Sequence, residues 1–378
     1  MGQRPARVED LGVKNCFGGA YADRHVFLTG HTGFKGSWLA LWLEAMGAKV
    51  TGFALNPADD PNAFGLLKPA GHDFRGNLRD FDALGKALCG ATPDLVIHMA
   101  AQALVRRSYR DTRETYETNV IGTVNLLEAV RLCPSVRGVV VVTSDKVYRN
   151  HEWPWSYRES DELGGHDPYS CSKSCAELVT ASYRNTIFRG ATPLVASARA
   201  GNVIGGGDWA EDRLIPDMAR AAAQGKELDV RNPTAIRPWQ HVLEPLSGYL
   251  MLGQRLLGGD AQASCAWNFG PGQESHAEAQ TVLQAFSRHW SKTRWRPAPV
   301  ANSSPEAMLL KLDHSLARQR LGWRPVWDLE CALKATADWY RTYYESRPAS
   351  MREHSLKDIS RYTAEARTQG LSWAASAN

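Results

Sequence analysis

The 378-residue sequence lacks the features that mark several large classes of protein. It contains no run of about 18 apolar residues, the length that a membrane-spanning helix needs. Residues Met1–Arg7 include no apolar segment of the kind found in signal peptides. Lysine and arginine total 44 against 40 acidic residues, so no excess charge suggests nucleic acid or an anionic membrane as a partner. We therefore expect a cytoplasmic protein with neither of these partners.

Cysteine is scarce and scattered. The seven cysteines are an odd number spread along the chain, which does not resemble a disulfide framework and favours reduced thiols. Cys171 and Cys175 lie four residues apart, but no neighbouring cluster of histidine or cysteine completes four metal ligands. No metal site is expected.

The apolar residues that are present form short runs alternating with helical patterns. Runs typical of strands buried on both faces occur at 25–29, 48–54, 94–98, 138–143 and 194–198. Helical patterns occur at 34–46, 80–89, 112–132 and 168–187. This alternation predicts an α/β fold with a Rossmann-type, doubly wound parallel sheet.

Beyond residue 200, glycines and prolines divide the chain into shorter pieces, which suits a smaller substrate-binding lobe. We expect a loose leader at 1–22, a dinucleotide-binding domain at 23–200 to which 240–263 returns, a lobe at 201–350, and a weakly patterned tail at 351–378.

A glycine-rich turn follows the first predicted strand. Thr29–Gly36 reads Thr-Gly-His-Thr-Gly-Phe-Lys-Gly and leads directly into a helical pattern. Glycines allow a tight turn and a close approach to a pyrophosphate, which binds the N–H groups at the helix N-terminus. The strand–turn–helix context therefore predicts a dinucleotide site. Its residues are Gly30, Thr32, Gly33, Phe34 and Gly36.

The choice between NAD and NADP depends on the end of the second strand. An acidic residue that binds the ribose is usual there, but Asn56 occupies the place and Asp59 and Asp60 come late. Because Asn56 can bond a ribose hydroxyl, NAD is the expected cofactor, with NADP left open.

Tyr169 and Lys173 begin a helical pattern after Pro168. Residues four apart share one helix face, and an ammonium group beside a phenol favours the phenolate, which can then act as a base. The turn at 29–36, Thr143-Ser144 at a strand end, and this pair resemble the extended short-chain dehydrogenase/reductase superfamily. The resemblance covers roughly residues 25–340. It implies that Ser144 and Tyr169 hold a sugar hydroxyl during hydride transfer to a nicotinamide.

Longer strings narrow the resemblance. Ser144-Asp145-Lys146, Arg149–Trp153, Arg199–Trp209 and Arg231–Tyr249 are similar to nucleotide-sugar 4,6-dehydratases, and to the branch that acts on CDP-glucose. This implies conversion of CDP-D-glucose to CDP-4-keto-6-deoxy-D-glucose for deoxysugar and surface-polysaccharide biosynthesis. The identification of cytosine as the nucleobase rests only on this overall similarity.

The chemistry of dehydration explains the triplet independently. Oxidation at C4 acidifies the C5 proton, a base removes that proton, and an acid protonates the departing 6-hydroxyl. Asp145 is expected to be the acid and Lys146 the C5 base, which requires Lys146 to be neutral at that step. With Ser144, Tyr169 and Lys173 they form the predicted catalytic set.

The resemblance also implies binding residues. Those for the cofactor, beyond the turn, are Asn56, Asn77, Leu78, Ala100, Ala101, Asn119, Tyr169 and Lys173. Those for the nucleotide sugar are Asn202, Arg213, Arg231, Arg237 and His241. Two positions depart from the pattern: Asn77 replaces the usual adenine-contacting aspartate, and Pro305–Ala307 reads Pro-Glu-Ala where close relatives have His-Glu-Ala.

Two other functions stay open. A nucleotide-sugar 4-epimerase shares the turn, Tyr169 and Lys173 but has no use for an acid and a base at 145–146. A non-catalytic dinucleotide-sensing protein typically dispenses with the Tyr–Lys pair. By the family pattern, a homodimer or a dimer of dimers is expected through the helices at 112–132 and 168–187.

Overall fold

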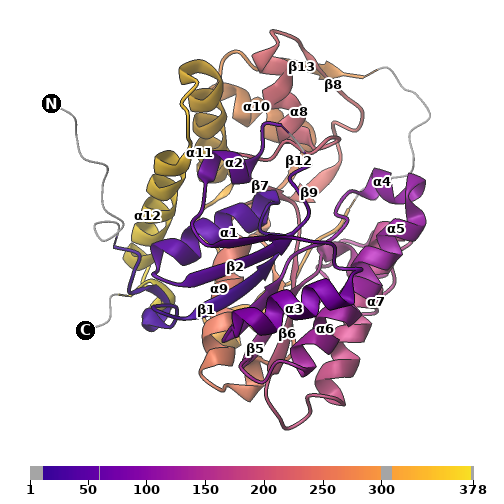
Figure 1. Ribbon diagram of the computed structural model, residues 1–378. Helices are drawn as coiled ribbons and strands as arrows, with labels where there is room; N and C mark the ends of the chain where they lie inside the picture. The colour runs from indigo at the N-terminus through magenta and orange to yellow at the C-terminus, as the bar shows by residue number, and fades with distance from the viewer. Residues whose placement is uncertain (1–11, 59, 299–308, 376–378) are drawn as a thin grey trace, which may run out of the picture.

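A parallel sheet of seven strands forms the centre of the molecule (Figure 1). The structure is a computed structural model that describes residues 12–58, 60–298 and 309–375. The strand order is β11-β6-β5-β4-β1-β2-β3, and every neighbouring pair is parallel. The strands are β1 (His25–Thr29), β2 (Lys49–Ala54), β3 (His72–Arg75), β4 (Leu95–His98), β5 (Gly138–Val142), β6 (Leu194–Ala200) and β11 (Ala266–Phe269). The predicted Rossmann-type α/β fold is confirmed.

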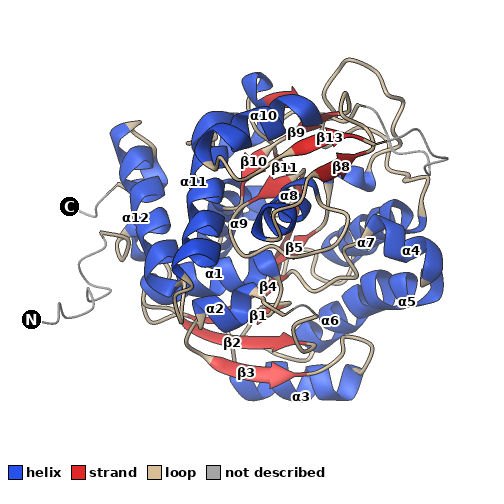
Figure 2. Ribbon diagram, turned by 90° about the horizontal axis from the view of Figure 1, so that it is seen from above, coloured by secondary structure: helices blue, strands red, loops and turns tan. Residues whose placement is uncertain are grey.

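Helices cover both faces of the sheet because its strands are apolar on both sides. In β5, Val140 points into one apolar core and Val139 and Val141 into another. The first core is shared with α1 (Phe34–Ala45) and α9 (Leu243–Leu257). The second is shared with α3 (Phe81–Ala91), α6 (Gly122–Arg131) and α7 (Pro168–Asn185). Figure 2 shows these layers from above.

The lobe beyond residue 200 sits over one end of this sheet, at the top of Figure 1. It is built on three two-stranded ribbons, which pair β7 (Val203–Ile204) with β10 (Gln240–His241), β8 (Leu228–Val230) with β13 (Trp295–Pro297), and β9 (Ile236–Pro238) with β12 (His276–Glu278). Its helices are α8 (Leu214–Ala223), α10 (Ala279–His289) and α11 (Leu329–Arg341). The range predicted for the lobe also supplies β11, the edge strand of the central sheet.

Short helices connect the main elements. They are α2 (Ala63–Leu67), α4 (Val105–Arg110), and α5 (Thr112–Tyr116), which continues through one π-helical turn (Glu117–Ile121) into α6. Within the described ranges, no helix is both long and apolar enough to cross a membrane.

Both ends of the described chain are more ordered than the sequence predicts. Phe17 and Tyr21, inside the expected loose leader, are fully buried, and Phe17 stacks on Trp373 at 5.0 Å. In the expected weakly patterned tail, α12 (Arg352–Thr368) packs on α1, and its Tyr362 is buried. These segments cover the outer surface of α1, whose Trp42 contacts the aromatic rings of both Phe17 and Trp373. The many tryptophans are therefore largely core residues.

Candidate active site

The glycine turn joins β1 to α1 and brings two backbones unusually close. Gly30 has φ +77°, and a Cβ there would lie 2.7 Å from the Ala100 nitrogen. A Cβ on Gly36 would lie 2.1 Å from the Gly30 carbonyl oxygen. Glycine is thus required at both positions, and the predicted residues Ala100 and Ala101, half-buried after β4, lie beside the turn.

The N-terminus of α1 is suited to a pyrophosphate. Gly33 is its N-cap residue and supplies no side chain to occupy the first N–H groups of the helix. The hydroxyl of Thr32 donates to the Leu55 carbonyl at 3.0 Å, which ties the turn to the end of β2. Half-buried Phe34 lies within reach of Gly205, where a Cβ would be 3.0 Å from its ring. A helix N-terminus that follows a glycine turn, and whose N–H groups donate to no capping side chain, is suited to bind the pyrophosphate of a dinucleotide.

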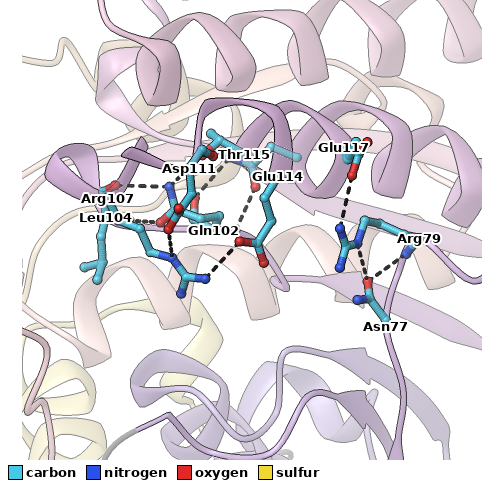
Figure 3. Close-up of polar contacts among 10 residues, drawn as sticks. Asn77, Arg79, Gln102, Leu104, Arg107, Asp111, Glu114, Thr115 and Glu117 are labelled. Carbon is cyan, nitrogen blue, oxygen red and sulfur yellow. Dashed lines mark hydrogen bonds and ion pairs between the residues drawn. The ribbon is translucent and has the colours of Figure 1, made fainter. Parts of the chain in front are cut away.

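Three further residues predicted for the cofactor lie beyond this turn. Asn56 is exposed just past β2, as a ribose-binding side chain would be. Asn77 accepts from the Arg79 backbone at 3.0 Å, and Arg79 is held by Glu117 at 3.0 Å (Figure 3). Leu78 is buried, with its carbonyl accepting from Asn125 at 2.8 Å.

Asn119 braces the turn after β4 from behind. Its Oδ1 accepts from the Gln102 backbone at 2.8 Å, and its Nδ2 donates to the Gln102 carbonyl and to Ser172 Oγ at 3.0 and 2.9 Å. Gln102 in turn bonds Thr115, as Figure 3 shows. Because the side-chain amide makes all three bonds internally, Asn119 links the turn to α7 as a support.

Ser144, Asp145 and Lys146 follow β5, the third strand from one edge of the sheet, and open a single helical turn (Asp145–Val147). Ser144 Oγ donates to Asp145 Oδ1 at 3.0 Å, and Lys146 Nζ lies 3.2 Å from the same oxygen. Asp145 is 1% exposed, and its Oδ2 is buried with no hydrogen-bond partner among the described residues. A buried, unsatisfied carboxylate oxygen is costly unless a ligand completes it.

Tyr169 and Lys173 come from the start of α7 and are both buried. Burial raises the pKa of Tyr169, while the Lys146 charge and a hydrogen bond with Ser144 oppose the rise. Burial lowers the pKa of Lys173 to about 8, and its Nζ donates to the Val142 carbonyl at 3.2 Å. The structure thus brings Ser144, Asp145, Lys146, Tyr169 and Lys173 together at the end of β5.

Lys35 belongs to the same cluster, although the sequence analysis did not select it. Burial and the nearby charges of Arg213, Lys173 and Lys146 lower its pKa to about 7, and Asp145 partly offsets them. Its position inside the glycine turn was the available signal, because that turn must face the catalytic strand end. Lys35, Lys146, Lys173 and Arg213 thus lie close enough for their charges to interact, and such a concentration of positive charge favours an anionic substrate.

The residues predicted to bind the substrate differ from one another in their surroundings. Arg213 pairs with buried Asp208 at 2.7 Å, and its charge partly opposes the rise that burial causes in the pKa of Tyr169. Arg231 pairs with Asp212 at 2.8 Å, and Arg237 donates to the carbonyl of Ile236 at 2.9 Å.

Asn202 lies half-buried after β6, where its carbonyl accepts from Gln240 at 3.2 Å. Pro305–Ala307 lie outside the described residues.

His241, which is predicted to bind the substrate, is enclosed by aromatic side chains. It is 1% exposed, and its ring packs between Trp38 and Trp327, with centroids 5.9 and 4.8 Å away. Burial lowers its pKa to about 3, so the ring is neutral. A histidine enclosed in this way contributes to the core, and its contact with the substrate stays a prediction.

No group of three or more metal-ligating side chains occurs among the described residues, and the seven cysteines, all described, are free thiols. A dinucleotide turn, a Ser–Tyr–Lys set and a paired carboxylate and amine define the class of protein. It is an epimerase or dehydratase of the extended short-chain dehydrogenase/reductase superfamily.

Comparison with known proteins identifies the family within that class. The family described as GDP-mannose 4,6 dehydratase matches residues 27–336. A CDP-glucose 4,6-dehydratase of Salmonella typhimurium is 46% identical over 346 residues, 90% of this chain and 96% of that protein. A dTDP-glucose 4,6-dehydratase of Xanthomonas campestris is 25% identical over 334 residues, 83% of this chain and 92% of that one. The chain belongs to this family of nucleotide-sugar 4,6-dehydratases.

Solved structures agree on the fold. The dTDP-glucose 4,6-dehydratase of Bacillus anthracis in complex with NAD matches with a TM-score of 0.71 and 22% identity over 85% of this chain and 98% of that one. The UDP-glucose 4-epimerase of Thermotoga maritima matches with a TM-score of 0.72 and 19% identity over 84% and 99%. Since both enzyme types share the fold, the fold does not separate dehydration from epimerisation.

Proposed function

We propose that the enzyme converts CDP-D-glucose to CDP-4-keto-6-deoxy-D-glucose with tightly held NAD. The observation that carries the proposal is Asp145: its buried Oδ2 lacks a partner among the described residues, and Lys146 Nζ lies 3.2 Å from its other oxygen. A carboxyl group and an amine at the end of β5 are what removal of water requires, and an epimerase has no use for them. The similarity to the CDP-glucose 4,6-dehydratase supports the choice of CDP-glucose.

We assign one or more residues to each step of the proposed reaction. Ser144 and Tyr169 hold the sugar 4-hydroxyl, and Tyr169 takes its proton, assisted by its hydrogen bond with Ser144 and by the charge of Arg213. Bound NAD, which Lys173 and the N-terminus of α1 would hold, would supply the hydride-transfer chemistry that the reaction needs at C4 and C6. Lys146 takes the C5 proton, and Asp145 protonates the 6-hydroxyl as it leaves. The diphosphate is bound by Asn202, Arg213, Arg231 and Arg237.

The reaction returns its own hydride, so no second substrate is needed. Incubation of the enzyme with CDP-glucose and mass analysis of the product tests the proposal. The product is expected to be lighter than the substrate by one water. An isomer of unchanged mass would instead establish the 4-epimerase.

Tyr169→Phe separates both enzymes from a dinucleotide-sensing protein. Turnover is expected to fall at least about 100-fold because the phenol is lost as the acid–base group. The cofactor still binds, since the ring is retained. A variant with the parent rate would leave Tyr169 without a chemical role.

We further propose a cytoplasmic homodimer, which can pair into a dimer of dimers. Ile121, on the π-helical turn after α5, is 51% exposed, and Leu178, on the neighbouring α7, is 58% exposed. Large apolar side chains on adjacent helices favour burial against a second copy. They lie on the helices that the family pattern assigns to the dimer.

A further inference from the structure

One buried ion pair lies directly behind the catalytic groups. Glu177 is on α7, one turn beyond Lys173 and two turns beyond Tyr169, so all three share a face of the helix. Its carboxylate lies 2.9 Å from Nη2 of Arg199, which comes from β6. The two side chains are 2% and 4% exposed. Burial alone would raise the pKa of Glu177, but Arg199 and two hydroxyl groups hold it below its usual value.

The ion pair forms hydrogen bonds with the residues on both sides of the segment 144–147, which contains Asp145 and Lys146. On the near side, Thr143 Oγ donates to Glu177 Oε1 at 2.5 Å, one residue before Ser144. On the far side, Arg199 Nη1 bonds the Tyr148 hydroxyl at 2.8 Å, two residues after Lys146. Ser197 donates to the second oxygen of Glu177 at 2.7 Å, which fixes the carboxylate itself. Residues 144–147 are therefore fastened at both ends to one ion pair.

From Tyr148 the hydrogen-bond network continues to residues beyond position 200. Tyr148 donates to Asn268 Oδ1 at 2.7 Å, and Asn268 Nδ2 donates to the carbonyls of Tyr157 and Asp313 at 2.9 and 3.1 Å. Tyr148 and Tyr157 stack with centroids 5.1 Å apart. The ion pair thus connects the catalytic helix, two central strands and the segments packed around residue 148.

We propose that Glu177 and Arg199 are positioning residues, which keep Asp145 and Lys146 in place opposite Tyr169 and Lys173. The inference rests on the proposed function, because it concerns that acid and base. Stability alone does not require such a pair, since well-packed apolar residues often serve equally well in a protein core. A shift of about 1 Å in a reacting group can cost about 100-fold in rate, so accurate placement is a sufficient reason for the pair.

The pair also acts on Lys173 through its charge. Glu177 raises the pKa of Lys173 against the effect of burial, so the ammonium form persists near neutral pH. Two other titratable groups whose charges interact with Lys173 are His98 on β4 and Lys35 in the glycine turn. Burial keeps His98 neutral with a pKa of about 3, and Lys35 repels the ammonium. Among these groups, Glu177 is the one that stabilises the charge.

Two variants test the proposal. Glu177→Gln keeps the shape of the side chain but leaves the Arg199 charge buried and unpaired, so it is expected to lower the melting temperature. The double variant Glu177→Gln/Arg199→Met removes both charges, and Tyr148 keeps Asn268 as a partner. Folding is checked by circular dichroism and by Kd for CDP. Glu244→Gln is the matched control, because Glu244 is equally buried but bonds Val326, Trp327 and Tyr362 in the core.

The folded double variant is expected to lose at least about tenfold in kcat, with KM for CDP-glucose within about twofold of the parent. Its alkaline limb of kcat should move to lower pH, because Lys173 loses the Glu177 charge. Glu244→Gln should show neither change. A double variant with parental kcat and an unshifted pH profile would reduce the pair to a structural role. If the parent itself forms no dehydrated product, the proposed function fails, and that result is separate from the comparison of variants.

Discussion

Lys146 Nζ lies 3.2 Å from Asp145 Oδ1, so the base and the acid of the proposed elimination are in direct contact. In the proposed elimination, Lys146 gains a proton from C5, and Asp145 loses one to the departing hydroxyl. Once the hydride reaches C6, Lys146 returns a proton to C5, and the proton that Tyr169 took from the 4-hydroxyl restores Asp145, so that all three groups are ready for the next turnover. Asp145 Oδ2 is buried without a hydrogen-bond partner among the described residues, and it is the oxygen that the proposed mechanism assigns to the sugar.

Replacement of the base is expected to stop the reaction after oxidation. Lys146→Met keeps the side-chain stem but cannot accept the C5 proton. Exchange of the C5 proton with solvent deuterium should fall at least about 100-fold, while substrate binding changes little. Lys35→Met removes a cation from the same cluster but leaves the base, so exchange should persist in that control. Undiminished exchange in Lys146→Met would contradict the assignment.

Gly36→Ala is expected to disrupt the dinucleotide turn. The added Cβ would lie 2.1 Å from the Gly30 carbonyl oxygen, so the turn must open. Calorimetry should show at least about tenfold weaker NAD binding, because the N–H groups of α1 no longer converge on the pyrophosphate.

Gly85→Ala is the control for that variant. A Cβ there, inside α3, meets nothing within 4 Å, and the change should stabilise the protein by up to about 1 kcal/mol. Parental NAD affinity in a folded Gly36→Ala variant would show that the turn does not hold the cofactor.

Leu178→Glu is expected to produce monomers if α7 forms the dimer contact. A charge at a side chain 58% exposed costs the single chain little but is unfavourable inside an apolar interface. Light scattering after size exclusion should show half the parental mass. Phe74→Glu, at a 46% exposed residue on edge strand β3, is the control and should leave the mass unchanged. Parental mass for Leu178→Glu combined with Ile121→Glu would place the interface elsewhere.

Glu244 should make stability fall as pH rises. Burial raises its pKa from 4.5 to about 7, so the folded state binds a proton more tightly than the unfolded state does. The stabilisation is complete below pH 4.5 and is lost as pH rises to about 7, a change of about 3 kcal/mol. Relative to the parent, Glu244→Gln should therefore be more favourable at pH 8 than at pH 4.5. A constant difference in melting temperature between the two proteins would contradict this, since other titrating groups affect both alike.

The central strands could be predicted because they are short apolar runs buried on both faces. β1 occupies the predicted residues 25–29, and β5 ends within one residue of its predicted limit. The edge strands could not be predicted: β3 has four exposed residues, and β11 follows a segment rich in small polar residues. Their place in the sheet comes from pairing with β2 and β6, which is a tertiary effect.

Some residues of the candidate site could likewise be predicted from the sequence, and others could not. Residues at strand ends and in the glycine turn could be found, because parallel strands deliver their carboxyl ends to one edge of the sheet. The surroundings of His241 could not be predicted, since its neighbours Trp38 and Trp327 are distant in sequence. The same holds for the pair of Glu177 and Arg199, which becomes visible once α7 lies on β6.

Product analysis across CDP-, dTDP-, GDP- and UDP-glucose tests the central claim most directly. Each sugar is incubated with the enzyme and NAD, and the mass and the 4-keto group of the product are measured. We expect CDP-glucose to be the preferred substrate and to give a 4-keto-6-deoxy product lighter by one water. Conversion of CDP-glucose to an isomer of equal mass, or no conversion by an enzyme that binds both NAD and CDP-glucose, would contradict the account.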